Sequence, residues 1–154
     1  MKEKTIASLK GVYFDLAYAM DNGISAYDVF DMYSADTFNF YEILYEDDFI
    51  KEEYESIWPN VFYVERLYVE KEYRNKGYAK ALLNEINNII RDILKLNVGQ
   101  IIVYANPFKV NNGADEMIRN NNYLIEKLLK LYKTTGFEEI DNDPRYLIKV
   151  CEKI

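Results

Sequence analysis

The sequence has no histidine and only one cysteine, Cys151, among 154 residues. Without histidine the chain cannot form Ser–His or Cys–His catalytic pairs, and it lacks a common zinc ligand, so we expect no metal site. A single thiol cannot form an internal disulfide, which favours a reducing compartment and predicts a cytoplasmic protein. The first ten residues lack the apolar core of a signal peptide, and no run approaches the ~20 apolar residues of a membrane span. We therefore expect no membrane partner.

The charge of the chain is acidic and unevenly distributed. The length suits a single domain over residues 1–154, and 49% apolar with 29% charged residues is a globular balance. A net charge of −7 argues against a nucleic-acid partner. Residues 1–60 hold 13 acids and 4 bases, whereas residues 61–154 hold 13 acids and 15 bases. This division indicates either a solvated acidic surface or two regions that bind ligands of opposite charge.

Hydrophobic periodicity predicts an α/β layer structure with a mixed sheet. Strands are expected over residues 4–18 (bulged at Gly11), 61–69, 100–105, 137–140 and 146–150. Ser25 and Ser34 are expected to cap two short helices, and longer helices are predicted over 77–96 and 123–135, the last closed by Gly136. Residues 46–60 indicate a loop or short helix, and the polar segment 106–122 indicates either a lid or a disordered loop.

One segment combines a strand end, a basic loop and a helix start. The strand ends near Val69, a charged connector follows, and the helix opens at Gly77. The first turn of a helix has N–H groups without internal partners, and glycine lets a ligand approach the backbone closely. Arg74, Lys76 and Lys80 add positive charge. The segment therefore predicts a phosphate or pyrophosphate site, although an ordinary loop before a helix is the alternative. It matches neither a Walker loop nor a Rossmann fingerprint.

Two motifs of the chain resemble the GCN5-related N-acetyltransferase (GNAT) superfamily. Residues 67–83 read Leu-x-Val-x-x-x-Tyr-Arg-x-x-Gly-x-Ala-x-x-Leu-Leu, similar to the family's central Arg/Gln-x-x-Gly-x-Gly/Ala behind a Leu-x-Val strand end. Residues 131–137, Leu-Tyr-Lys-Thr-Thr-Gly-Phe, resemble the family's Phe/Leu-Tyr-x-x-x-Gly-Phe near the C-terminus. The resemblance implies a single-domain GNAT-type fold, a mixed, mostly antiparallel central sheet flanked by helices. Residues 61–140 would form the acyl-CoA-binding core and residues 1–60 the acceptor side.

The same resemblance implies acetyl-CoA as co-substrate, with an acetyl group passed to a primary amine. Carried over by position, the pyrophosphate would be held by backbone amides and cations of one segment, comprising Arg74, Asn75, Lys76, Gly77, Tyr78 and Ala79. The backbone around Leu67, Tyr68 and Val69 would pair with the pantetheine arm like an added strand, which requires strand 61–69 to separate from strand 100–105. The family's asparagine seven residues before the tyrosine is Ile125 here, so Asn106 or residues 120–122 would replace that contact.

The resemblance also implies two catalytic residues, Tyr132 and Glu65. Tyr132 matches the tyrosine that faces the coenzyme sulfur and would protonate the leaving thiolate, whereas an ordinary core aromatic is the alternative. Glu65 lies four residues before Val69, where many members carry a carboxylate that acts as base. Burial among apolar neighbours would raise the pKa of Glu65 into a useful range, whereas a pairing with a nearby lysine or arginine is the alternative.

The acceptor is left open by the sequence. The acidic and aromatic region 1–60 favours a cationic amine, such as a polyamine, an aminoglycoside, or a lysine or N-terminal amine of a protein, unless these aromatics are core. An acyl-CoA-binding sensor or scaffold without turnover is the alternative function, and a plain interaction domain is a third. The acyl group and the oligomeric state, with a homodimer as one alternative, are also open.

Overall fold

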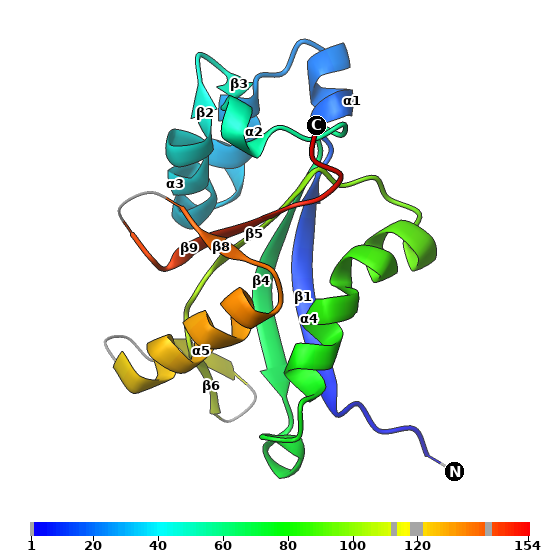
Figure 1. The fold of residues 1–154 in the computed structure, drawn as a ribbon, viewed down its shortest axis with the longest axis vertical. Helices are drawn as coiled ribbons and strands as arrows, with labels where there is room; N and C mark the ends of the chain where they lie inside the picture. Colours follow the sequence, from blue (N-terminus) through cyan, green and yellow to red (C-terminus); the bar gives the residue numbers. More distant parts are fainter. Residues whose placement is uncertain (1, 112–113, 118–121, 141–142) are drawn as a thin grey trace.

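The computed structural model describes residues 2–111, 114–117, 122–140 and 143–154, with only the backbone for 108–111 and 114–117. Its centre is a five-stranded sheet of order β1–β4–β5–β9–β8 (Figure 1). The strands are β1 (Ala7–Phe14), β4 (Val61–Val69), β5 (Gln100–Tyr104), β9 (Tyr146–Val150) and β8 (Glu138–Glu139). Only β4 and β5 run parallel, which confirms the predicted mixed, mostly antiparallel sheet.

Helices cover both faces of this sheet and create two cores. On one face, α1 (Leu16–Asp21), α2 (Ala26–Tyr33) and α3 (Ala35–Leu44) pack against Tyr63 and Ile102. On the other face, α4 (Tyr78–Asn88) and α5 (Asn122–Thr134) pack against Phe62 and Val64. The first half of β4 is therefore buried on both sides, as its continuous apolar pattern predicts.

The predicted helix boundaries have the expected local chemistry. Ser25 Oγ accepts a hydrogen bond from the Asp28 backbone N–H at 3.1 Å, and Ser34 forms a capping box with Thr37. Gly136, with φ +99°, follows α5 as predicted. The predicted helix over 77–96 consists of α4 and a π-helical turn at Ile89–Ile93.

The strand predicted over residues 4–18 is too long. A helix begins directly after Phe14, because Asp15 accepts a hydrogen bond from the Tyr18 backbone N–H at 3.0 Å. The Ala17 N–H also donates to Asn60 Oδ1, a partner 43 residues away that the local pattern does not reveal. The register with β4 shifts between Lys10 and Gly11, as predicted for a bulge, but the extra residue is Glu65 on β4, since Lys10 pairs with Arg66 and Gly11 with Val64. A Cβ at Gly11 would lie 2.2 Å from the Phe62 ring, so the position requires glycine.

Two connecting segments contain short hairpins that the sequence pattern did not predict. Residues 45–50 form β2 (Tyr45–Glu46) and β3 (Phe49–Ile50), followed by a 3₁₀ turn at Glu52–Tyr54. Within 106–122, β6 (Phe108–Asn111) pairs with β7 (Ala114–Met117). The prediction of a lid or disordered loop lies partly outside the described residues, since 112–113 and 118–121 are not among them.

Candidate functional site

The centre of the sheet opens where β4 and β5 stop pairing. Their parallel register runs from Val61 opposite Gln100 to Val64 opposite Val103. β4 then continues for five more residues along β1 alone, to Val69 opposite Ala7. In the described part of the chain, β5 therefore supplies no partner for residues 65–69, and the separation that the pantetheine-binding prediction requires is present.

The backbone of Leu67 and Val69 faces this opening. The Glu70 N–H donates to the Ile6 carbonyl at 2.8 Å, so Ile6 and Glu70 form a hydrogen-bonded antiparallel pair. Such pairs alternate with non-hydrogen-bonded ones along an antiparallel ladder. Leu67 and Val69, in the alternate positions, therefore direct their N–H and C=O groups away from β1. These are the groups that an extended ligand would need as partners.

The turn from β4 into α4 has the backbone of an anion site. Asn75 and Gly77 both adopt left-handed conformations, with φ of +61° and +86°. No side chain caps the first turn of α4, and that turn contains no acidic residue. A Cβ built on Gly77 would have no neighbour within 4 Å, so the helix start faces open space. Uncapped N–H groups at the positive end of a helix dipole bind phosphate well.

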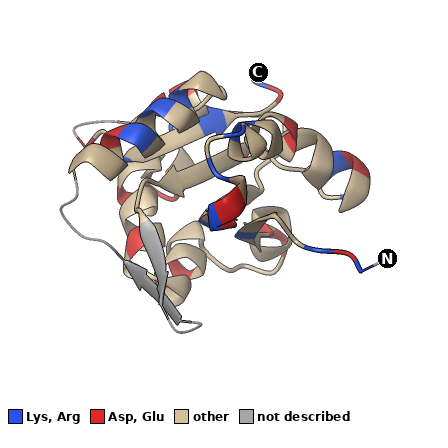
Figure 2. Ribbon diagram, turned by 90° about the horizontal axis from the view of Figure 1, so that it is seen from below, with Lys and Arg blue, Asp and Glu red and all other residues tan. Residues whose placement is uncertain are grey.

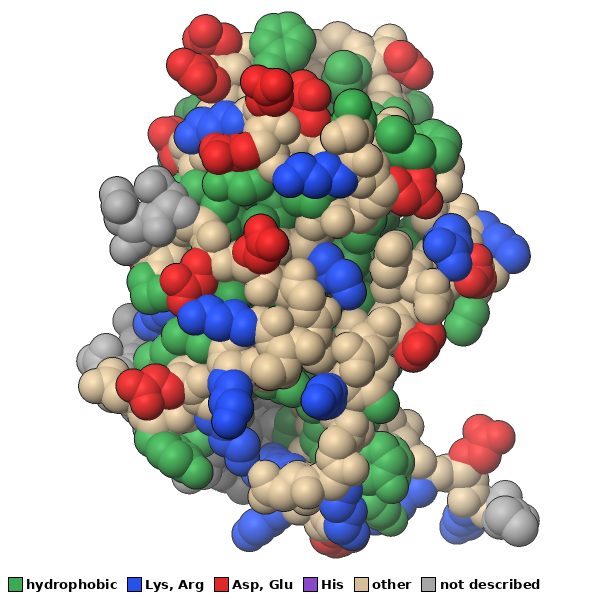
Figure 3. Space-filling view, viewed as in Figure 1, with side chains coloured by type: hydrophobic (Ala, Val, Ile, Leu, Met, Phe, Trp, Pro, Cys, Tyr) green, Lys and Arg blue, Asp and Glu red, His purple; other side chains and the backbone are tan. Residues whose placement is uncertain are grey.

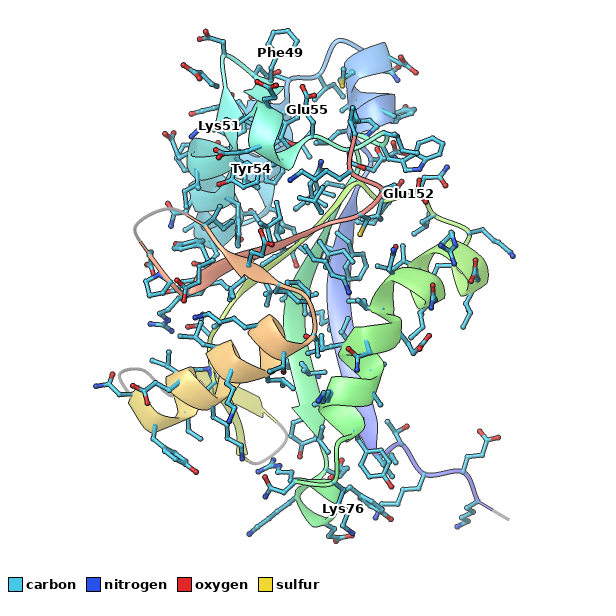
Figure 4. The ribbon with its side chains drawn as sticks, in the orientation of Figure 1. Phe49, Lys51, Tyr54, Glu55, Lys76 and Glu152 are labelled. Carbon is cyan, nitrogen blue, oxygen red and sulfur yellow. The ribbon has the colours of Figure 1, made fainter. Side chains whose placement is uncertain are left out.

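Basic side chains from two elements surround this turn. Arg74, Lys76 and Lys80 are exposed on the turn and on α4. From α5, Lys127 Nζ donates a hydrogen bond to Asn75 Oδ1 at 3.0 Å. Figure 2 shows Lys and Arg both along α5 and in the turn before α4, and Figure 4 places Lys76 at the end of the molecule opposite Lys51 and Glu55. Lys127 escaped the sequence analysis because its partner is 52 residues away.

Arg74 also holds the end of β4. Its Nε donates to the Val69 carbonyl at 2.9 Å, and its guanidinium lies 5.6 Å from the centre of the Tyr68 ring. The side chain thus connects the strand end to the basic turn. Tyr78, the first residue of α4, is exposed, and Ala79 is half-buried.

Tyr132 lies deep in the second core. Its side chain is only 4% exposed, and its ring packs edge-on against Phe137 at 5.5 Å. Burial raises the pKa of Tyr132 well above its ordinary value, so the phenol stays protonated at neutral pH. That is the form a proton donor requires. Both interpretations of Tyr132 therefore remain compatible with its surroundings, since it is a core aromatic with a protonated hydroxyl.

Glu65 is not surrounded by apolar residues as expected. Its side chain is 31% exposed, and Oε2 lies 3.1 Å from Lys10 Nζ, so the alternative of a paired glutamate is the one observed. Oε1 accepts a hydrogen bond from Tyr33 Oη at 2.8 Å. Oε2 is itself buried, and the angle to Lys10 falls outside hydrogen-bonding geometry.

Tyr63 interacts electrostatically with both candidate catalytic residues. Burial raises the pKa of Tyr63, and the neighbouring Asp36 and Glu65 raise it further, followed by Tyr33 and Tyr132. Its hydroxyl therefore lies within electrostatic range of Glu65 on β4 and of Tyr132 on α5. The sequence pattern alone predicts Tyr63 only as a core residue of the strand. The sequence signal that could have identified Tyr63 as a site residue was its position two residues before Glu65, on the same face of β4.

Asn106 lies two residues beyond the end of β5. Its Oδ1 accepts a hydrogen bond from Arg145 Nη2, a partner that the sequence pattern did not indicate. The predicted contact of Asn106 with the coenzyme therefore stays a prediction. Of the other candidates for that contact, Asn122 is exposed at the start of α5, and residues 120–121 lie outside the described residues.

These features define a class of protein. It is an α/β domain whose two central strands separate, with an uncapped and basic helix start beside the gap. A binding site for an acyl-CoA requires this arrangement. The acetyltransferase (GNAT) domain matches residues 38–139, and the chain belongs to this family. The matched range contains β4, the basic turn, α4, β5 and α5. A comparison with curated proteins gave no match.

Two further features concern the described residues only. None of their helices is both long and apolar enough to cross a membrane. They also contain no group of three or more His, Cys, Asp or Glu side chains placed to hold a metal ion.

Proposed function

We propose that the protein is an N-acetyltransferase that moves the acetyl group of acetyl-CoA to a primary amine. Membership of the GNAT family implies an acetyltransferase that uses acetyl-CoA. The observation that carries the proposal for this chain is the separation of β4 from β5 directly beside the turn before α4. A thioester held by the free edge of β4 would have Tyr132 on one side and Glu65 on the other.

The donor is held by backbone groups and by charge. The N–H groups at the start of α4, with Arg74, Lys76 and Lys127, would bind the pyrophosphate. The inward-facing N–H and C=O groups of Leu67 would pair with the amides of the pantetheine arm, which leaves the Val69 N–H for the thioester oxygen. Cations near the pyrophosphate add favourable charge, and the backbone ladder sets the position of the thioester.

The transfer step needs one proton acceptor and one proton donor. The amine nitrogen attacks the thioester carbon, a C–N bond forms, and the C–S bond breaks. Glu65 takes the amine proton, directly or through a water, and Tyr132 gives its phenolic proton to the leaving thiolate. The backbone amide of Val69, which faces the opening, stabilises the oxyanion. The ammonium form of the acceptor loses two protons in all: one passes through Glu65 to solvent before the nitrogen attacks, and the other balances the proton gained by the thiol once Tyr132 is reprotonated.

The acceptor in this proposal is a cationic amine. Figure 3 shows acidic side chains gathered over the end of the molecule that contains α2, α3, β2 and β3, and basic ones toward the opposite end. Most aromatics of residues 1–60 are partly or fully buried, and Phe40 is fully so. Recognition of the ammonium would therefore depend on Tyr33, Asp36 and Glu65 near the opening rather than on an aromatic lining.

The test is turnover of acetyl-CoA with a panel of primary amines, measured as free CoA released. We expect Tyr132→Phe and Glu65→Gln each to lower kcat by about 100-fold or more, the range for loss of general acid–base catalysis. Acetyl-CoA binding by calorimetry should change little. Tyr123→Phe, an exposed change on the same helix, is the control and should keep wild-type activity.

Two outcomes would contradict the proposal. Tight binding of acetyl-CoA without turnover of any amine would favour a sensor or scaffold. A preference for aromatic amines, which are uncharged at neutral pH, over aliphatic ammonium compounds would contradict the cationic acceptor.

A further inference from the structure

The side chain of Arg145 is held in one orientation beside the opening of the sheet. Its Nε donates to the Ala105 carbonyl at 3.1 Å, and Nη2 donates to Asn106 Oδ1. The guanidinium lies 4.7 Å from the centre of the Tyr104 ring. Tyr104, Ala105 and Asn106 directly follow Val103, the last residue of β5 that pairs with β4. The charge is therefore positioned where the two strands separate.

This guanidinium has no counter-ion in the part of the chain that the structure describes. The ion pairs recorded there join other residues, and none includes Arg145. Two acids lie near Arg145: Asp143, whose Oδ1 accepts a hydrogen bond from the Arg145 backbone N–H at 3.0 Å, and Asp36, which is half-buried on α3. Burial raises the pKa of Asp36 and the charge of Arg145 lowers it, yet no ion pair joins the two side chains among the described residues. A half-buried cation without a paired anion is unfavourable, so an incoming anion would be stabilised here.

Arg145 and Glu65 lie on the same face of the sheet. Val64 is opposite Val103, the last residue of β5 that pairs with β4, and Tyr104 is opposite Tyr146. Glu65, Tyr104 and Tyr146 therefore lie just beyond the last paired row. Tyr63 and Tyr146 both belong to the core on the α2–α3 face, which places Glu65 and Tyr104 on that face by strand alternation. In the last paired row, which contains Val64, Val103 and Leu147, neighbouring strands lie ~4.8 Å apart, so β4 and β9 are about 10 Å apart there. The distance is larger one residue further on, where β4 and β5 no longer pair.

We propose that Arg145 binds a carboxylate of the acceptor, so that the substrate is an aliphatic amine that also carries a carboxylate several carbon atoms away. The inference rests on the proposed function. The amine reaches Glu65 and Tyr63 at the opening, while the carboxylate is bound by the remaining N–H groups of Arg145. The guanidinium fork suits a carboxylate geometrically, and its stacking on Tyr104 keeps it in place. Acetyl transfer then proceeds at the amine, and the carboxylate does not react.

The matched substrates are 6-aminohexanoate and 6-aminohexanamide, which differ in the charge of one end. We expect wild-type kcat/KM to be at least about tenfold higher for the carboxylate, as a charge-assisted pair provides. Arg145→Gln should abolish this ratio, chiefly by raising KM for 6-aminohexanoate. Arg145→Lys keeps the charge without the fork and should retain part of the ratio. A series from 3-aminopropanoate to 6-aminohexanoate then measures the distance between the two sites.

Arg91→Gln is the control variant, because Arg91 is exposed and pairs with Asp92. It should leave the ratio of the two substrates at its wild-type value. Thermal melting of each variant checks the fold. Equal kcat/KM for the two substrates in the wild type, or an equal loss for both in Arg145→Gln, would overturn the inference and assign Arg145 to supporting the chain around β9. Turnover of no amine at all would instead overturn the proposed function, and this inference with it.

Discussion

At the scale of single residues, Tyr63 shows how a core position participates in a site. Its ring packs with Phe40 in the first core, while its hydroxyl responds to Glu65 and Tyr132 on separate elements. Because its pKa is raised by burial and by neighbouring acids, the hydroxyl remains a hydrogen-bond donor at neutral pH. In the proposed reaction, Tyr63 would orient a substrate group between Glu65 and Tyr132.

Cys151 offers a clean measurement at this scale, because it is the only thiol. It is 4% exposed, and burial raises its pKa from 9.0 to about 11. The thiolate is the reactive form, so iodoacetamide at pH 8 should modify the native protein at least about 100-fold more slowly than the urea-unfolded chain. Mass spectrometry of the alkylated protein provides the rate, and Cys151→Ser is the unlabelled control.

The same group makes stability depend on pH in a defined direction. The pKa of Cys151 is higher in the folded protein than in the unfolded chain. The contribution of the protonated thiol to the free energy of unfolding is therefore complete below pH 9 and is lost as the pH rises through about 11. For the iodoacetamide experiment, equal alkylation rates for the native and the urea-unfolded protein would show that the Cys151 thiol is not buried.

At the scale of elements, α5 and the turn before α4 act together. A hydrogen bond from Lys127 to Asn75 joins them directly. α5 also carries Tyr132 five residues further on, so one helix contributes to both the phosphate end and the thiol end of the proposed coenzyme site. Displacing this helix should affect binding and chemistry together.

Lys127→Ala should weaken acetyl-CoA binding about fivefold, because one exposed cation near a pyrophosphate contributes roughly 1 kcal/mol. Calorimetry at low salt measures the effect, and it should shrink in 0.5 M salt as charges are screened. Lys130→Ala, on the exposed part of the same helix, is the matched control. An equal loss of affinity in both variants would mean that only the overall charge of α5 matters.

At the scale of the whole molecule, two cores share one sheet. Phe40 and Leu83 are both fully buried, one in each core, and β4 contributes side chains to both. We expect Phe40→Ala and Leu83→Ala each to lower the free energy of unfolding by about 3 kcal/mol, through lost transfer energy and cavity formation. Urea denaturation followed by circular dichroism and tyrosine fluorescence provides this value.

The shared sheet also predicts cooperativity. Both variants should unfold in a single transition with coincident probes, because loosening either core exposes the same strands. Two resolved transitions in either variant would mean that residues 1–60 and the remainder unfold as separate units.

The sequence by itself determined the features that depend on near neighbours along the chain. Ser25 and Ser34 cap helices through residues three positions later, and Gly11 marks where the register with β4 shifts. The segment from Val69 to Ala79 carries the motif that resembles the family, and it lies within the matched range 38–139. These signals are readable because caps, left-handed turns and strand alternation are set within a few residues. The strand 61–69 was predicted to its last residue for the same reason.

Only the tertiary structure decided which distant groups meet at the opening. Glu65 lies between Tyr33 and Lys10, Lys127 reaches Asn75, and Arg145 binds Asn106. Each pair is separated by 32 or more residues, so strand order and helix packing bring its members together, and no local pattern encodes the contact. For this reason the prediction that Glu65 is buried among apolar residues was wrong. The strand pattern cannot reveal that Lys10 of β1 lies beside it.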